Sequence, residues 1–326
     1  MRVLVTGVYG FIGSYFAKWL LSMDPEVQIV GFGRSSDQRN SRRLLANPRL
    51  QLVHGDLRGV SGLCEGIDVV VNFAAMTFVD HSLKDRAPFR ESNLVGAECL
   101  MDDAERYGVT RFLQISTDEV YGQILTGSYK EDALLNPRNP YSLYKACADL
   151  SAIQRHRTTG FPVIITRTEN NFAPWQPRQK ALPTFVREAL AGRPIPVYGD
   201  GLHVRCWLHV EEHCRAVWHL VKWNRLYPDT NKVWPSIDYP LGEVFHVAGE
   251  QEMTNLALAK FVLRTLGKSE EAIRLVPDHD IRPGHDRRYA LDCTKLKDTG
   301  FEIKQDLEAR LRETILWYAE HPEWTR

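Results

Sequence analysis

Residues 6–13 read TGVYGFIG, and this octapeptide decides the fold. Gly7, Gly10 and Gly13 follow the β-branched run RVLVT at 2–6 and open the helical pattern GSYFAKWLLSM. Glycines permit a tight turn and a close approach of the backbone to a pyrophosphate, whose charge then meets the helix N-terminus. A glycine triad alone is weak evidence. With a strand before it and a helix after it, the triad predicts a dinucleotide-binding site.

Short apolar runs alternate with helical patterns through the first half of the chain. The runs are apolar throughout rather than alternating, which is typical of parallel strands buried on both faces. The expected strands are 2–6, 27–32, 50–55, 68–74, 111–116 and 163–167. Their alternation with helices such as 93–108 predicts an α/β fold with a doubly wound parallel (Rossmann) sheet.

The texture of the sequence changes after about residue 170, where prolines cluster at 174, 177, 183, 194 and 196 and strand patterns become sparse. We expect residues 1–170 to form the dinucleotide-binding domain and residues 171–326 a smaller, irregular α/β substrate domain. A segment near 206–248 is expected to return to the Rossmann core, since 243–249 has a strand pattern. Amphipathic patterns at 256–267 and 307–321 predict helices.

Composition excludes several classes of partner. Among 326 residues, 41 Lys and Arg balance 41 Asp and Glu, which gives no overall field for nucleic acid or an anionic membrane. The N-terminus enters a strand pattern without a signal-peptide architecture, and no apolar run approaches the length of a membrane span. The six cysteines form no CxxC motif, so we expect reduced thiols in a cytoplasmic protein.

One motif raises the possibility of a metal. His209 and His213 in HVEEH are four residues apart and could share a helical face. The glutamates are placed differently from those of HExxH, and no third ligand lies nearby in the sequence. We therefore expect no metal site.

A second informative stretch, STDEVYG at 116–122, places Asp118 and Glu119 where an apolar strand ends. Adjacent acids repel, and burying either is costly unless it is partnered or protonated. Downstream, NPYSLYKACADL puts Tyr141 and Lys145 four residues apart on one helical face. A lysine beneath a tyrosine lowers the pKa of the phenol. The resulting base could take a proton from a sugar hydroxyl while hydride leaves the same carbon.

The glycine turn and the YxxxK pair together resemble the extended short-chain dehydrogenase/reductases. Within that class STDEVYG, NPYSLYKA, PVYGDG and RPGHDRRYA closely resemble the dTDP-glucose 4,6-dehydratases, over residues 1 to about 301. TDE is the most discriminating element, since relatives that only epimerise or decarboxylate carry other residues there. The resemblance implies a cofactor-dependent lyase acting on a nucleotide-diphosphate hexose. It also implies a homodimer formed through helices near 88–107 and 141–157.

The resemblance assigns roles to five catalytic residues. Tyr141, aided by Lys145, would start oxidation at C4 of the hexose, with Thr117 bonded to the 4-hydroxyl. Glu119 would remove the C5 proton and protonated Asp118 would donate to the departing C6 hydroxyl, before the hydride returns to C6. Proximity in a desolvated pocket pushes the pKa values of such neighbouring carboxyls apart.

Binding residues for both ligands are also implied by the resemblance. The cofactor would contact Gly7, Gly10, Phe11, Ile12, Gly13, Arg34, Ser35, Asp56, Leu57, Ala74, Ala75, Thr77, Asn93, Tyr141 and Lys145, although Asp56 could equally cap a helix. The sugar nucleotide would contact Asn170, Lys180, Tyr198, Arg205, His246, Arg282 and His285. Cations suit a diphosphate and an aromatic ring suits a base. The alternative is a set of solvated surface cations.

The sequence departs from the family pattern in three places. AAMTFVDHS has Met76 and Phe78 where the family has a carboxylate and a histidine, which either reshapes the sugar pocket or is a neutral packing change. VFHVAG has His246 where an asparagine is usual. The second strand ends at Gly33 rather than at an acid.

The third departure concerns the choice between NAD and NADP. NAD is the family default, but Gly33 offers no carboxylate to bind ribose hydroxyls or to repel a 2′-phosphate. Arg34, with the serines after it, could pair with that phosphate. We therefore expect NADP to be accepted at least as well as NAD. A solvated arginine is the alternative.

The most favoured function is dTDP-glucose 4,6-dehydratase. The same chemistry on a UDP-, CDP- or GDP-linked hexose is the nearest alternative, followed by a nucleotide-sugar epimerase or decarboxylase. A non-catalytic cofactor-binding protein is a further alternative, but such a protein should tolerate loss of TDE or YxxxK, and this chain retains both.

Overall fold

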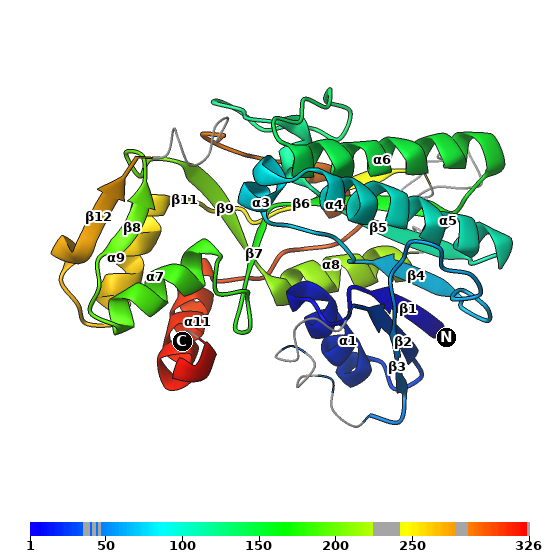
Figure 1. The fold of residues 1–326 in the computed structure, drawn as a ribbon, viewed down its shortest axis with the longest axis horizontal. Coiled ribbons are helices and arrows are strands. Elements are labelled where there is room, and N and C mark those ends of the chain that lie inside the picture. The colour runs from blue at the N-terminus through cyan, green and yellow to red at the C-terminus, as the bar shows by residue number, and fades with distance from the viewer. Residues whose placement is uncertain (35–39, 41–43, 45–46, 224–241, 278–285, 325–326) are drawn as a thin grey trace.

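A seven-stranded parallel sheet forms the centre of the molecule (Figure 1). The computed structural model describes residues 1–324 except 35–39, 41–43, 45–46, 224–241 and 278–285. The strand order is β10-β6-β5-β4-β1-β2-β3, and every neighbouring pair is parallel. The strands are β1 (Arg2–Thr6), β2 (Gln28–Gly33), β3 (Leu50–His54), β4 (Val69–Asn72), β5 (Arg111–Thr117), β6 (Val163–Thr168) and β10 (Val244–Val247).

Helices cover both faces of this sheet because successive side chains of a strand point to opposite faces. In β1, Val3 and Val5 belong to a core shared with α1 (Phe11–Met23) and α8 (Val210–Lys222). Leu4 belongs to a second core, beneath α5 (Gly96–Arg106) and α6 (Pro140–Thr159). Burial of both faces explains the continuous apolar runs in the sequence.

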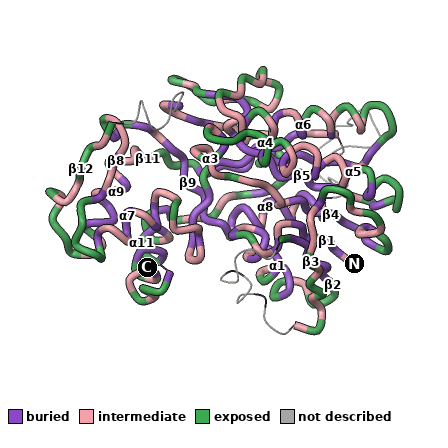
Figure 2. The backbone as a smooth tube through the Cα atoms, viewed as in Figure 1, coloured by how far each residue is buried: buried purple, intermediate pink, exposed green. Residues whose placement is uncertain are grey.

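A smaller lobe lies beside the sheet, with its own apolar core (Figures 1 and 2). The pairing β11-β9-β7 forms one small sheet and β12-β8 another. Helices α7 (Ala181–Leu190), α9 (Asn255–Thr265) and α11 (Leu307–Glu320) pack together in this core. The strands are β7 (Asn170–Phe172), β8 (Ile195–Tyr198), β9 (Val204–His209), β11 (Glu252–Thr254) and β12 (Ile273–Val276).

Short elements complete the described chain. Between β4 and α5 lie α3 (Val79–Lys84), α4 (Ala87–Arg90) and the π-helical turn Glu91–Val95, and α10 (Thr294–Lys297) precedes α11. The 3-10 turns are Asp118–Tyr121, Glu270–Ala272 and Pro322–Trp324. No helix in the described ranges is long and apolar enough to cross a bilayer.

The predicted doubly wound fold is confirmed, and so is the predicted strand at 243–249, as β10 beside β6. One expectation about burial is wrong. β3 is the edge strand, and its five residues are half-buried or exposed because only β2 pairs with it. The strands of the small lobe were largely missed, since they are three to six residues long and pair with segments remote in sequence.

A buried ion pair fixes α6 to the sheet. Asp149 of α6 is fully buried and its Oδ2 accepts from Arg167 Nε of β6 at 3.0 Å. The same oxygen accepts from Ser116 Oγ of β5 at 2.9 Å. Thus one carboxylate joins α6 to two adjacent strands near their carboxyl ends.

Removing the charge of Asp149 should be strongly destabilising. Asp149→Asn leaves the Arg167 guanidinium buried without its counter-ion, and breaking such a pair costs about 3–5 kcal/mol. Asp102→Asn is the matched control, because Asp102 pairs with Arg155 while 60% of its side chain is exposed, and it should cost about 0–1 kcal/mol. Guanidinium unfolding followed by tryptophan fluorescence measures both. Equal losses would show that α6 does not depend on this pair.

Candidate active site

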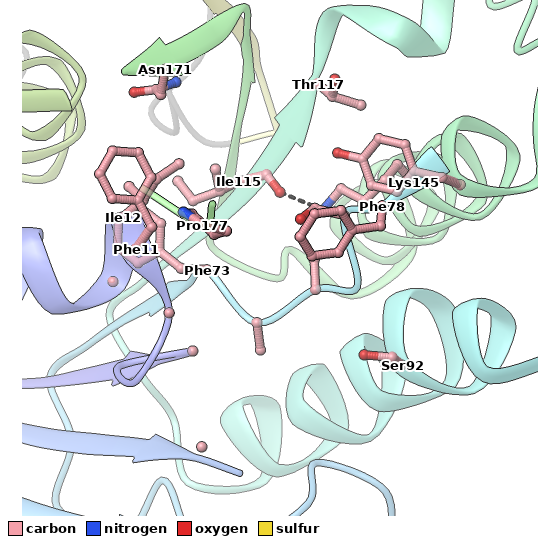
Figure 3. Close-up of a pocket in the computed structure, with 18 of the residues that line it drawn as sticks. Phe11, Ile12, Phe73, Phe78, Ser92, Ile115, Thr117, Lys145, Asn171 and Pro177 are labelled. Carbon is pink, nitrogen blue, oxygen red and sulfur yellow. Dashed lines mark hydrogen bonds between the residues drawn. The ribbon is translucent and has the colours of Figure 1, made fainter. Parts of the chain in front are cut away.

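A cavity of about 550 Å³ opens at the carboxyl ends of the central strands. It is lined by the glycine turn, by the ends of β2, β5 and β6, and by loops from the small lobe (Figure 3). The predicted site residues that it brings together are Gly7, Gly10, Phe11, Ile12, Gly13, Arg34, Asp56, Leu57, Ala74, Ala75, Thr77, Thr117, Asp118, Glu119, Tyr141, Lys145, Asn170 and Lys180.

The glycine turn fits a pyrophosphate. Gly7 has φ +64°, and a Cβ there would lie 2.8 Å from the backbone of Phe73 and Ala74. A Cβ on Gly13 would lie 2.3 Å from the Gly7 carbonyl oxygen. Gly10 caps α1 without a side-chain bond, and the first turn of α1 carries no acid. The first turn of α1 is therefore free of competing side chains, which suits the phosphates of a dinucleotide.

Among the described residues that line the cavity beside Gly33, one carboxylate is present, and it follows the third strand rather than the second. Asp56 caps no helix. It forms an ion pair with Arg58 at 2.9 Å and a longer one with Arg34 at 3.7 Å. The hydrogen bond from Arg58 lowers the pKa of Asp56, so the carboxylate is charged. Arg34 is half exposed beside Gly33 in the cavity wall, and Ser35 lies outside the described residues.

The two acids of STDEVYG occupy a 3-10 turn, Asp118–Tyr121, directly after β5. Thr117 Oγ1 donates to Asp118 Oδ1 at 3.0 Å, and Asn139 Nδ2 donates to Glu119 Oε2 at 3.1 Å. Burial and the neighbouring Glu119 raise the pKa of Asp118 to about 7. Burial also raises the pKa of Glu119, while Asn139, Lys180 and Arg205 oppose that rise. Asp118 is thus the acid that keeps its proton near neutral pH.

The Tyr141 and Lys145 pair departs from expectation in one respect. Lys145 Nζ donates to the carbonyl oxygen of Ile115, as Figure 3 shows, and burial lowers the pKa of the amine to about 8. The pKa of Tyr141 is raised, not lowered, because the phenol is buried and Glu119 lies near it. The protein alone therefore does not generate a phenolate, and further positive charge is required in the cavity.

Phe78 lies in the cavity wall. Of the two interpretations of this departure from the family pattern, its position favours a reshaped sugar pocket over a neutral packing change. Lys180 Nζ lies 4.9 Å from the centre of the Phe78 ring and donates to the Thr77 carbonyl oxygen at 3.0 Å. Lys180 comes from the small lobe and Phe78 from the loop after β4. The two side chains place a cation against an apolar ring where the small lobe meets the loop after β4.

Several predicted residues do not line the cavity. Asn93 is buried and bonds to both backbone groups of Met76, so it braces the loop. His246 is fully buried, with Nε2 2.7 Å from Tyr121 Oη and Nδ1 2.9 Å from the Asp292 carbonyl oxygen, and burial lowers its pKa to about 3. Because both ring nitrogens are occupied, we assign His246 to this buried network rather than to substrate contact.

The remaining substrate residues are placed differently. Arg205 is buried, donates to the carbonyl oxygens of Val204 and Asp286, and has its guanidinium 4.5 Å from the centre of the Tyr289 ring. Tyr198 ends β8 in the small lobe and does not line the cavity. Arg282 and His285 lie outside the described residues.

The histidine pair of HVEEH has structural contacts. His209 caps α8 by accepting from the Glu211 amide, and His213 Nδ1 is 3.1 Å from Asn171 Oδ1. Burial lowers the pKa of His213 to about 3, so its ring is neutral. Among the described residues, no group of three potential ligands is close enough to hold a metal ion.

The structure adds cavity residues that sequence reasoning missed. Seven of them lie near the acid pair, in the last residues of β5 and β6, between β6 and β7, in β7 or in the loop that follows β7: Ser116, Thr168, Glu169, Asn171, Gln176, Pro177 and Gln179. Glu169 is the most informative, because it is a buried carboxyl beside the predicted acid pair. Its signal was its position two residues after the predicted strand 163–167.

A doubly wound sheet with a glycine-lined cavity, a Tyr–Lys pair on α6 and a carboxyl pair after β5 defines an extended short-chain dehydrogenase/reductase. The chain belongs to the GDP-mannose 4,6 dehydratase family, whose model matches residues 4–314.

Curated relatives and solved structures cover almost the whole chain. It is 40% identical to a dTDP-glucose 4,6-dehydratase of Actinoplanes sp., over 99% of each sequence. It is also 40% identical to the low-salt glycan biosynthesis protein Agl12 of Haloferax volcanii, over 98% of each. The crystal structure of the dTDP-glucose 4,6-dehydratase DesIV from Streptomyces venezuelae, which has NAD bound, superimposes with a TM-score of 0.89 at 37% identity. That match covers 99% of this chain and 98% of DesIV.

The glycine turn should not tolerate a methyl group at its tightest point. Gly13→Ala places a Cβ against the Gly7 carbonyl oxygen, so the turn must open and dinucleotide binding should weaken by at least tenfold, or about 1.4 kcal/mol. Lys18→Ala, at an exposed position of the same helix, is the control. Fluorescence titration with NAD measures both affinities. Unchanged binding by Gly13→Ala would show that the turn does not contact the dinucleotide.

Proposed function

We propose that this protein is a nucleotide-sugar 4,6-dehydratase, with dTDP-glucose as its substrate and NAD as its cofactor. The observation that carries the proposal is the buried acid pair Asp118 and Glu119, which shares one cavity with Tyr141 and the glycine turn. An enzyme that only epimerises at C4 has no need of a second, protonated carboxyl. The named functions of full-length relatives support the same conclusion.

The chemistry follows from the charges around each group. NAD, held by the glycine turn, would supply the acceptor and later the donor of the hydride, and its oxidised ring would add positive charge to the cavity. That charge and Lys145 favour Tyr141 as the base for the 4-hydroxyl proton. Oxidation at C4 acidifies C5–H, whose proton Glu119 takes, and its electrons form the C5–C6 double bond. Asp118 gives its proton to the C6 hydroxyl, which leaves as water. Glu119 then returns its proton to C5 as C6 takes back the hydride, which restores Glu119 and leaves the 4-keto-6-deoxy sugar.

The proton balance of one turnover gives Thr117 a further role. Tyr141 gains the proton of the 4-hydroxyl, and Asp118 loses one to water. Thr117 hydrogen bonds to the phenol and also donates to Asp118 Oδ1 at 3.0 Å. A shift of two protons along this chain returns the phenol proton to Asp118 and restores both groups.

The direct test mixes purified protein with dTDP-, UDP-, CDP- and GDP-linked hexoses and looks for a 4-keto-6-deoxy product by mass spectrometry. We expect turnover of dTDP-glucose above the others. Turnover of a different nucleotide hexose would keep the chemistry and change the substrate. An epimerised product, or no product from any of them, would contradict the proposal.

Asp118→Asn should separate oxidation from loss of water. The amide cannot supply a proton to the C6 hydroxyl, so reduced cofactor should accumulate while product formation falls by about 10²–10⁴-fold. Absorbance of reduced nicotinamide and product release are measured in the same reaction. A variant with wild-type product formation would remove Asp118 from the mechanism.

Cofactor choice turns on Arg34, which lies within 3.7 Å of the Asp56 carboxylate. That carboxylate would repel a 2′-phosphate, and NAD is bound in solved relatives, so we propose NAD as the resident cofactor. Arg34 would still lend NADP some affinity. Arg34→Ala should therefore weaken NADP binding by about tenfold or more and leave NAD binding within about twofold. Equal effects on both would make Arg34 a general surface contact.

We propose that residues 1–170, with 206–248, bind the dinucleotide and that the rest of 171–326 binds the sugar nucleotide. The pairing of β10 with β6 and the packing of α8 on α1 support this division. Reduced cysteines support a cytoplasmic location, since none of the six forms a disulfide.

We propose a homodimer through α5 and α6. Leu143 and Leu150 of α6 are seven residues apart and therefore share a face, where they are 43% and 55% exposed. Leu143→Lys combined with Leu150→Lys should convert the protein to a monomer in sedimentation velocity. The control pair, Leu52→Lys with Leu275→Lys, adds the same charge at leucines of β3 and β12 that are 42% and 54% exposed, away from α5 and α6. A wild-type monomer at micromolar concentration would contradict the proposal.

A further inference from the structure

A third buried carboxyl stands beside the acid pair. Thr117 and Thr168 are Cα partners at the ends of the parallel strands β5 and β6. The residue that follows each of these threonines is an acid, Asp118 after β5 and Glu169 after β6. Both are at least 95% buried and both line the cavity. Strand register, rather than sequence proximity, brings these two carboxyls together.

Each of these carboxyls has one bonded oxygen and one buried oxygen without a hydrogen-bond partner. Asp118 Oδ1 accepts from Thr117 Oγ1, and Glu169 Oε1 accepts from the Leu291 amide at 3.2 Å. Asp118 Oδ2 and Glu169 Oε2 are buried and have no partner in the described structure. A buried carboxylate oxygen without a donor is costly, and a proton on one carboxyl relieves the cost for both.

Burial, Asp118 and Glu252 favour the protonated form of Glu169, whereas hydrogen bonds from the Cys206 thiol and the Leu291 amide favour its carboxylate. Asp118 faces it from the turn after β5, the Cys206 thiol from β9, Glu252 from β11, and Cys293 from the loop before α10. Arg288 is a nearby cation in the described part of the chain, and its guanidinium is bound to Glu252. Burial and the charge of Asp118 raise the pKa of Glu169 well above its usual value.

We propose that Glu169 is a positioning residue for the elimination, which acts by sharing protons with Asp118 so that Asp118 remains a proton donor in neutral and mildly alkaline solution. The proposal rests on the proposed function, because Asp118 is the acid of that reaction. The proposal also accounts for the buried carboxyl of Glu169, which takes part in no step of the reaction described above.

The protons balance over the cycle. With one proton between the two carboxyls, the pair carries a single negative charge, and the proton resides on Asp118 for part of the time. When Asp118 protonates the departing C6 hydroxyl, the C6–O bond breaks and water leaves, while Glu119 holds the C5 proton. The pair is then short of one proton until Thr117 returns the one that Tyr141 gained. Neighbouring carboxyls that couple in this way titrate in two macroscopic steps, as a pair.

Glu169→Gln tests the sharing, because an amide keeps the shape and cannot exchange the proton. For Asp118 as the acid, activity falls as pH rises through the range where Asp118 deprotonates. Without a partner carboxyl, Asp118 should deprotonate earlier, so the alkaline limb of kcat should move to lower pH by about one unit. The fall in kcat should therefore be about tenfold larger at alkaline pH than in mild acid. An unmoved limb, or one moved to higher pH, would overturn the proposal.

Two further variants guard against a purely structural effect. Glu169→Asp retains a carboxyl and should keep the alkaline limb near its wild-type pH, even if kcat is lower. Glu131→Gln is the control, because Glu131 is a half-buried acid with a raised pKa that accepts from a backbone amide, yet it does not line the cavity. Its pH profile should match the wild type. A limb that moves equally in Glu131→Gln would show general loosening instead.

A readout that needs no turnover separates this proposal from the proposed function. Infrared difference spectra record the C=O stretch of protonated carboxyls as pH is raised. Wild-type protein should lose this band in two coupled steps, and Glu169→Gln should lose one of them. Two steps without turnover of any nucleotide hexose would sustain the pair and reject the dehydratase. Turnover with independent titration of the carboxyls would do the reverse.

Discussion

The buried contact of Asp149 with Arg167 and Ser116 is the constraint on which the site depends. It holds α6 across the ends of β5 and β6, the two strands that deliver the acids. Tyr141, Lys145 and Asp149 are spaced at i, i+4 and i+8, so one face of α6 carries the anchor, the amine and the phenol. Desolvating an ion pair is costly. Here the pair fixes the position of α6 and so keeps the Tyr141 phenol within hydrogen-bonding reach of Thr117.

Burial is the second constraint, and it acts together on four ionisable groups around the acid pair. It raises the pKa of Asp118, Glu119 and Tyr141, and it lowers that of Lys145. All four shifts favour neutral forms. The charged forms of these four groups are therefore disfavoured until a charged ligand enters the cavity. The proposed acid, Asp118, already holds its proton before a ligand binds. The proposed base, Tyr141, becomes a phenolate only when a ligand brings positive charge.

Local chemistry could be predicted from the sequence, and long-range register could not. The glycine turn, the acid pair and the Tyr–Lys spacing are short patterns whose geometry depends on neighbours in the chain. Glu169 and His246 were misjudged or missed because their surroundings come from remote segments. Glu169 meets Asp118 only through the pairing of β5 with β6. His246 turns to Tyr121 and Asp292 rather than to the cavity. The exposure of β3 likewise depends on its place at the sheet edge.

The same distinction explains how two adjacent acids can take the opposite roles that we propose for them. Sequence adjacency creates the conflict, since Asp118 and Glu119 cannot both be charged in a buried turn at low cost. Remote residues resolve it. Asn139 of the α6 cap and Lys180 of the small lobe stabilise the carboxylate of Glu119. For Asp118, burial and the charge of Glu119 outweigh the hydrogen bonds from the Thr117 hydroxyl and the Glu119 amide and the influence of Arg205, so it holds the proton. The proposed division between base and acid is therefore a property of the assembled fold. It depends on Asn139 at the start of α6 and on Lys180 of the small lobe, both remote from β5 in sequence.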